Sequence, residues 1–254
     1  MGKTLFFTTA FNPQNIELAR NMVNSFHKFH PNTEVKVFTQ EDLPNFLPVP
    51  GYEWNFRITP LFAVRLLQEY DTVVRLDTDQ IITGNLDHIL EGDYDVAVVQ
   101  NSNPRDYMLR YRKTGQMLTA VDIPYLDYVN CGFVVIKNLK FAQHWFGLCN
   151  SKYFPFFQFR EQDFLNILIH YFPYKTKFLD KSNKWHGLIS KGFWPQIELK
   201  DDKLILPKND EWPKDESKEI VCLHVAGGGS VSKFHDLNIR FKPEVINHLK
   251  GLIK

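Results

Sequence analysis

Two aspartates, Asp77 and Asp79, stand one residue apart where an apolar run of the sequence ends. The run, Val73–Leu76, predicts a buried strand, so both carboxylates follow it directly. Two carboxylates at this spacing can share a divalent cation, because Thr78 between them lets the backbone turn. Hard oxygen ligands suit Mg²⁺ or Mn²⁺, and either ion can bridge to phosphate oxygens. The pair therefore indicates metal-assisted chemistry on a phosphate-bearing substrate.

The same spacing recurs in Asp93-Tyr94-Asp95, so spacing alone is a weak signal. Position distinguishes the two pairs, because open α/β sheets bind ligands at the carboxyl ends of their strands. The first pair follows its strand, whereas the second precedes the predicted strand Val96–Val99 and belongs at the opposite edge. A solvated turn or a helix cap is the structural alternative for Asp77 and Asp79. No lysine or arginine lies in that turn, which favours the metal site.

His224 is the second candidate ligand. It ends the short apolar strand Val221–His224 and precedes the glycine-rich segment Ala226–Ser230. Imidazole can complete an oxygen-rich coordination sphere, and glycines let backbone N–H groups approach a phosphate closely. A lone histidine beside a strand is more often a packed core residue, so the residues alone leave both interpretations open.

The elements that would carry these residues alternate between strands and helices in the first half of the chain. This order predicts an α/β protein with a mostly parallel central sheet and helices on both faces. Strands are expected over residues 5–9, 35–38, 73–76, 96–99, 133–136 and 221–224. Helices are expected from Asn12-Pro13 and Thr59-Pro60, over 85–90 and 161–169, and at the end of the chain, with long loops over 41–58 and 101–127.

The composition is that of a globular protein with a sizeable core, since 44% of the residues are hydrophobic and 23% are charged. Thirty Lys and Arg balance 29 Asp and Glu, which argues against nucleic acid as a partner. Cys131, Cys149 and Cys222 form neither a disulfide framework nor a zinc pattern, which indicates a reducing compartment. No apolar run approaches the ~20 residues of a transmembrane segment. We expect a single cytoplasmic domain over residues 1–254, without a signal peptide.

Four segments together resemble one family. They surround Asp77-Thr78-Asp79 (residues 70–90), Asn130-Cys131-Gly132 (130–136), Glu161-Gln162-Asp163 (161–166) and His224 (224–227). Their order and spacing are similar to those of the glycogenin and bacterial galactosyltransferase family, which are retaining nucleotide-sugar glycosyltransferases of family 8. The resemblance covers about residues 3–235. It implies a single Rossmann-like domain of the GT-A fold, with a nucleotide-binding half (about 1–135) and an acceptor-side half (about 136–254).

The resemblance also implies an activity and a set of functional residues. Asp77, Asp79 and His224 would hold Mn²⁺ or Mg²⁺ on the pyrophosphate of a nucleotide-sugar donor, for which a UDP-sugar is expected. A hexose would pass to a glycan, protein or lipid-linked sugar acceptor. Gln162 matches the glutamine near the anomeric carbon, and Glu161 stands where the family usually has aspartate. The donor-binding residues implied are Thr8, Thr9, Ala10, Arg65, Asp77, Thr78, Asp79, Asn130, Gly132, Gly227 and Lys233.

The sequence departs from the family pattern at two basic positions. The C-terminal lysine that contacts phosphate in the family is replaced by Ser230, and the nearest lysine is Lys233. The basic residue early in the helix before the metal motif is also missing; Leu61 stands near its place, and Arg65 is the candidate substitute.

A catalytically inactive nucleotide-sugar or glycan-binding relative is therefore the alternative. A two-metal phosphohydrolase would need further clustered carboxylates, and the sequence offers no convincing set. The aromatic cluster at 153–159 could stack on an acceptor sugar or form a small core.

Overall fold

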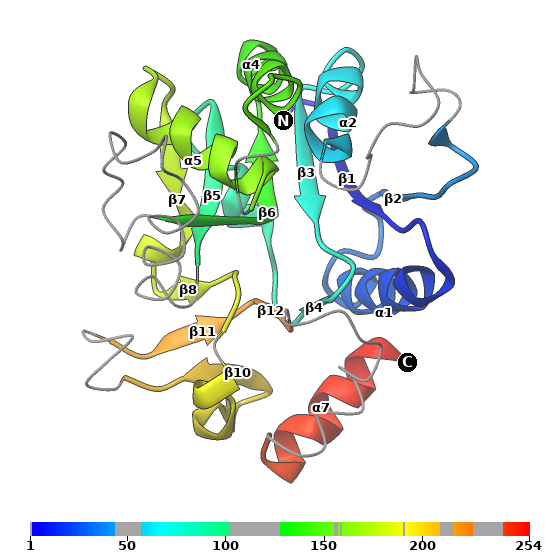
Figure 1. Ribbon diagram of the computed structural model, residues 1–254. Helices are drawn as coiled ribbons and strands as arrows, with labels where there is room; N and C mark the ends of the chain where they lie inside the picture. Colours follow the sequence, from blue (N-terminus) through cyan, green and yellow to red (C-terminus); the bar gives the residue numbers. More distant parts are fainter. Residues whose placement is uncertain are drawn as a thin grey trace.

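The computed structural model describes residues 2–43, 57–101, 128–154, 157, 159–189, 191–208, 216–225 and 241–254. Its central layer is a six-stranded sheet of β1 (Thr4–Thr9), β2 (Val35–Phe38), β3 (Thr72–Leu76), β5 (Val96–Gln100), β6 (Val129–Ile136) and β7 (Thr176–Phe178). The strand order is β2-β1-β3-β6-β5-β7 (Figure 1). Only β6 runs antiparallel to its neighbours in this sheet. The expected α/β class with a mostly parallel sheet is confirmed.

One face of this sheet is covered by three helices. They are α2 (Ile58–Leu66), α4 (Leu139–Cys149) and α5 (Glu161–Tyr171). Because successive side chains of a strand point to opposite faces, Phe7 and Val73 belong to the core under these helices. The N-terminus of α4 is capped by the side chain of Asn138, which accepts hydrogen bonds from two backbone N–H groups of the first turn.

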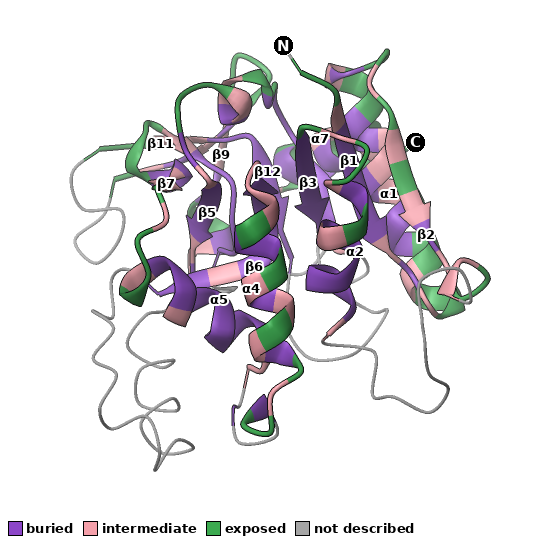
Figure 2. Ribbon diagram, turned by 90° about the horizontal axis from the view of Figure 1, so that it is seen from above, coloured by how far each residue is buried: buried purple, intermediate pink, exposed green. Residues whose placement is uncertain are grey.

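The opposite face packs against α1 (Pro13–Phe29) and the 3₁₀ turn η3 (Asp87–Leu90). Phe6 and Val74, the strand neighbours of the residues on the first face, belong to this second core. Figure 2 shows the buried strands in the middle, between helices whose outer faces are exposed. Because both faces are covered, the inner strands β3, β5 and β6 are mostly apolar, whereas the edge strands β2 and β7 carry half-buried or exposed residues.

A second, smaller sheet and a two-stranded ladder complete the described fold. The sheet consists of β8 (Lys184–Trp185), β9 (Glu198–Lys200), β10 (Lys203–Leu206) and β11 (Lys218–Ile220), in the order β8-β11-β10-β9. It shares a hydrophobic core with α7 (Pro243–Ile253). The ladder pairs β4 (Gln80–Ile82) with β12 (Cys222–His224). None of the helices in the described ranges is both long and apolar enough to cross a bilayer. The remaining described elements are the 3₁₀ turns η6 (Leu179–Lys181) and η7 (Lys191–Gln196).

Candidate active site

The three predicted metal ligands meet where β3, β4 and β12 come together. Asp77 and Asp79 flank the turn that leads from β3 into β4, and β12 places His224 opposite the first residue of β4. The backbone N–H of Asp77 donates to the Gly132 carbonyl over 2.8 Å. The backbone N–H of Val225 donates to the Asp79 carbonyl over 3.0 Å. The turn is therefore held between β6 and the end of β12.

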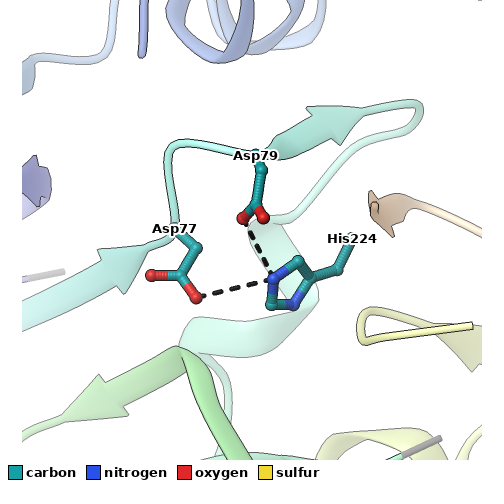
Figure 3. A group of neighbouring side chains, drawn as sticks. All are labelled: Asp77, Asp79 and His224. Carbon is teal, nitrogen blue, oxygen red and sulfur yellow. Dashed lines mark ion pairs between the residues drawn. The ribbon is translucent and has the colours of Figure 1, made fainter. Parts of the chain in front are cut away.

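The side chains of these three residues point toward one another (Figure 3). Nε2 of His224 lies 3.1 Å from Oδ1 of Asp79 and 3.5 Å from Oδ2 of Asp77. One ligand atom from each of the three residues lies within 4.8 Å of the other two. The side chain of His224 is buried, whereas those of Asp77 and Asp79 are 30% and 15% exposed. The group is therefore open to solvent on its carboxylate side.

This donor set fits a divalent cation. Ligand atoms at right angles around an ion with bonds of 2.0–2.1 Å lie about 3 Å apart, close to the separations found here. Burial lowers the pKa of His224, but the carboxylates of Asp79 and Asp77 outweigh it and raise the pKa above its ordinary value. A cation would take the place of the proton that otherwise links the imidazole to these carboxylates. Two carboxylates and one imidazole suit Mn²⁺ or Mg²⁺.

Gly132 in β6 lies against the ligands, and only a glycine fits there. A Cβ on this residue would lie 2.4 Å from Oδ2 of Asp77 and 2.5 Å from Cε1 of His224. It would also lie 2.7 Å from Oδ1 of Asn130. Gly132 therefore packs directly against Asp77 and His224, two of the three predicted metal ligands.

Gln162 and Asn130 are joined to each other and to β6. Oε1 of Gln162 accepts hydrogen bonds from the Cys131 N–H (3.1 Å) and from Nδ2 of Asn130 (3.2 Å). Oδ1 of Asn130 accepts from the Gly132 N–H at 2.7 Å. The first turn of α5 is thereby connected through Asn130 to Gly132, which packs against Asp77 and His224. With its oxygen already accepting two hydrogen bonds, Gln162 is suited to positioning and not to nucleophilic attack.

Glu161 presents a buried carboxyl group beside this network. Its Oε1 is 3.8 Å from Sγ of Cys131, and its Oε2 finds no hydrogen-bond partner among the described residues. Burial, which disfavours the charged form, raises the pKa of Glu161 to about 8, and Arg75 opposes that rise only in part. Glu161 is therefore a protonated, neutral acid at pH 7.

Replacing Glu161 with Gln should stabilise the metal-free protein increasingly as the pH rises from 5 to 8. The folded protein keeps its proton up to about pH 8, whereas the unfolded chain releases it near the ordinary value of 4.5. The free energy of unfolding of the wild type therefore falls by up to about 4 kcal/mol across this interval. The Gln variant has no titrating group at this position, so its free energy of unfolding does not fall for this reason. Thermal unfolding of both proteins in EDTA at pH 5, 6, 7 and 8 measures the difference, with the exposed Glu69→Gln as control. A constant difference between the wild type and the variant would contradict a neutral Glu161.

Arg75 is a site residue that the sequence interpretation missed. No basic residue lies within the turn, but Nη2 of Arg75 in β3 lies 2.5 Å from Oδ1 of Asp77. Residues two apart on a strand share a face, so the spacing of Arg75 and Asp77 already predicts that their side chains lie on the same side. The absence of a basic residue from the turn is therefore no argument for the metal site, since β3 itself supplies one.

The remaining expected donor-binding residues differ in placement. Residues 8–10 lie at the carboxyl end of β1, which pairs parallel with β3, so they share an edge with Asp77. Thr78 is half-buried within the turn. Arg65 is exposed in the last turn of α2, whereas the first turn contacts Arg75. The last two expected residues, Gly227 and Lys233, lie outside the described residues.

The aromatic cluster at 153–159 lies only partly in the interior, since Tyr153 is 41% exposed and Phe159 is half-buried. Phe154 and Phe157 are buried and pack against Phe164 in α5. His186 is fully buried, and its Nε2 lies 2.6 Å from Nε2 of His88. Phe154, Phe157 and His186 are therefore core residues, whereas Tyr153 is the exposed member of the cluster.

No protein-family model and no curated protein matches the sequence. Solved structures do match. The chain is similar to the bifunctional glycosyltransferase WbbM in its apo form, with 13% identity and a TM-score of 0.59, over 98% of this chain and 51% of WbbM. It is similar to the galactosyltransferase LgtC in complex with donor and acceptor sugar analogues, with 15% identity and a TM-score of 0.55, over 97% and 95% of the two chains.

A third similar structure is a glycosyltransferase involved in the glycosylation of the major capsid of PBCV-1. It shares 10% identity and a TM-score of 0.54, over 93% of this chain and 99% of that one. The chain thus spans about half the length of WbbM and nearly the whole of the other two. At these identities the similarity establishes the fold, and the chain has the GT-A fold of glycosyltransferases.

Proposed function

We propose that the chain is a metal-dependent, retaining glycosyltransferase. It would move a hexose from a nucleotide-diphosphate sugar, with UDP-sugars as the first candidates, to a hydroxyl group of a glycan, protein or lipid-linked acceptor. The observation that carries the proposal is the convergence of Asp77, Asp79 and His224 at the carboxyl end of β3 in a GT-A fold. LgtC, which has this fold, was solved with donor and acceptor sugar analogues.

The proposed cation site consists of the two carboxylates and the imidazole. Mn²⁺, or alternatively Mg²⁺, would be held by Asp77, Asp79 and His224. When bound, the ion supplies Lewis-acid chemistry, because it neutralises negative charge on the departing diphosphate. The partly exposed carboxylates leave the solvent side of the group accessible to a donor.

The proposed transfer exchanges one bond for another at the anomeric carbon. The bond from that carbon to the diphosphate oxygen breaks, and a bond to the acceptor oxygen forms. The electron pair of the broken bond stays on the diphosphate oxygen, which takes up the proton of the acceptor hydroxyl as the nucleoside diphosphate leaves. Gln162, fixed by its contacts with β6, would position the sugar, and Glu161 would offer a neutral hydrogen-bond donor beside it. A buried acid that stays protonated at neutral pH can donate without adding negative charge.

The proposed donor site extends along one edge of the sheet. Residues 8–10, at the end of β1, would bind the nucleoside, while Asn130 and Gly132 line the sugar side. Gly227 and Lys233 are proposed for the phosphates on sequence grounds. The nucleotide would therefore bind mainly to residues 1–135, with residues 136–254 forming the acceptor side.

A catalytically inactive nucleotide-sugar binder is the second candidate. Ser230 at the position of the family lysine favours it, because a phosphate-binding cation is missing from that position. The two functions differ in one respect, since a binder would retain the donor without cleaving it.

A donor screen tests the proposal. The protein is incubated with Mn²⁺ and a panel of UDP-, GDP- and dTDP-sugars, and release of the nucleoside diphosphate is followed by NMR. Slow hydrolysis of one donor class is expected, and the first-formed anomer of the sugar should retain the donor configuration. Saturation-transfer signals from a donor that is never cleaved, even with acceptor sugars added, would favour the inactive binder. If no donor is cleaved and none is bound, both functions are contradicted.

A further inference from the structure

Arg75 is a buried charged residue in the centre of the main sheet. Its neighbours in β3 are Thr72, Val73, Val74 and Leu76, and the strand is buried along its whole length. The side chain of Arg75 is 11% exposed. Burying a guanidinium costs several kcal/mol unless its N–H groups are paired, so its partners indicate why an arginine is placed here.

The three nitrogens of the guanidinium reach three different segments. Nε donates to Oγ1 of Thr59 in the first turn of α2, at 3.0 Å. Nη1 donates to the backbone carbonyl of Cys131 in β6. Nη2 pairs with Oδ1 of Asp77 at 2.5 Å. A planar guanidinium fixes the directions of these bonds, so α2 and β6 hold it in the orientation that meets Asp77.

The two oxygens of Asp77 have different partners. Oδ1 faces Arg75, whereas Oδ2 lies 3.5 Å from Nε2 of His224. One oxygen is thereby anchored while the other is directed at the proposed cation. Carboxylates that bind metals are commonly held by such an outer hydrogen bond, and its loss typically lowers metal affinity 10–100-fold.

We infer that Arg75 is a positioning residue for the metal ligand Asp77. The inference rests on the proposed function, because it assigns Arg75 to the same cation site. In this chain, Thr59 and Cys131 hold the guanidinium of Arg75, and the guanidinium in turn orients the carboxylate of Asp77.

A purely electrostatic role predicts the opposite effect on cation binding. A positive charge so close to the site repels a divalent cation, so its removal should then tighten Mn²⁺ binding. A positioning role predicts weaker binding, because Asp77 loses its anchor. The Arg75→Lys variant separates the electrostatic role from the positioning role further. Lysine keeps the positive charge but lacks the planar guanidinium that donates in three fixed directions.

The test is an EPR titration of the metal-free protein with Mn²⁺ alone. Arg75→Lys and Arg75→Met should each weaken Mn²⁺ binding about 10–100-fold. Thr59→Val, which removes the acceptor for Nε, should weaken it by a smaller factor. Arg20→Lys, on the exposed face of α1, is the matched control and should bind as the wild type does. Circular dichroism confirms folding, and Thr59→Val keeps the inference testable if the Arg75 variants do not fold.

Tighter binding by Arg75→Met, or unchanged binding by both Arg75→Lys and Thr59→Val, would overturn the inference. A wild-type protein that binds no Mn²⁺ would overturn it together with the metal site. If the wild type binds Mn²⁺ and the variants bind it weakly, but no nucleotide sugar is cleaved, Arg75 keeps its role and the proposed transferase activity fails. The two hypotheses therefore fail separately.

Discussion

Asp79→Asn is expected to reduce Mn²⁺-dependent cleavage of the nucleotide sugar by about 10²–10³-fold. A bound cation typically stabilises the developing charge by several kcal/mol, and each 1.36 kcal/mol corresponds to a factor of ten in rate. Oδ1 of Asp79 is the carboxylate oxygen at 3.1 Å from Nε2 of His224, so an amide here removes one of the two negative charges that attract the ion. The rate of nucleoside diphosphate release, measured against Mn²⁺ concentration, tests the expectation.

Asp93→Asn is the matched control for Asp79→Asn. Asp93 belongs to the other pair of aspartates at the same spacing, and its carboxylate is exposed and paired with Lys175. The Asp93→Asn variant should cleave the donor at the wild-type rate and with the wild-type dependence on Mn²⁺. Equal activity of Asp79→Asn and Asp93→Asn would show that the carboxylates after β3 do not hold a catalytic cation.

Gly132→Ala should produce the second large effect, a loss of about 100-fold in donor cleavage together with weaker Mn²⁺ binding. The added methyl group would lie 2.4 Å from Oδ2 of Asp77 and 2.5 Å from Cε1 of His224, well inside contact distance. Either the ligands or β6 must shift. Overpacking a well-packed region costs about 1–3 kcal/mol of stability, so the variant should still fold.

The matched control is Gly147→Ala. Gly147 lies inside α4, and a Cβ there meets no atom within 4 Å. Alanine should raise stability by about 0.5–1 kcal/mol at that position and leave activity unchanged. Thermal unfolding, Mn²⁺ titration and donor cleavage are compared for the two variants. If Gly132→Ala cleaved the donor as fast as Gly147→Ala, close packing of Gly132 on the metal ligands would have no role in catalysis.

The elements that carry the site were predictable because their sequences show a clear period or a clear end signal. The Val73–Leu76 run lies within β3, and Asn12 caps the predicted helix α1. The second pair of aspartates precedes β5 (Val96–Gln100), as predicted, and Asp95 binds Asn138 and the backbone of Lys175. Asp77, Asp79 and His224 converge because β4 pairs with β12, two strands more than a hundred residues apart.

Other parts of the fold give little signal in one sequence. β4, β7, β9 and β11 have three residues each and β10 has four, which is too short to show a strand period. Helix α4 went unpredicted, although Asn138 caps it and its apolar face is buried. The role of Arg75 depends on Thr59 and Cys131, which approach it only after folding. Contacts between distant segments decide the short strands and the role of Arg75, whereas the sequence does carry the local signals of α4.

The most direct test of the metal-bridged donor site is the affinity for UDP with and without Mn²⁺. Calorimetric titration should show that Mn²⁺ tightens UDP binding at least about tenfold in the wild type, because an ion held by Asp77, Asp79 and His224 would neutralise charge on the diphosphate. Mn²⁺ should increase the affinity for UMP, which lacks the β-phosphate, much less. In the Asp79→Asn variant, Mn²⁺ should not increase the affinity for either nucleotide. Equal UDP affinity in Mn²⁺ and in EDTA would contradict the proposed metal-bridged donor site.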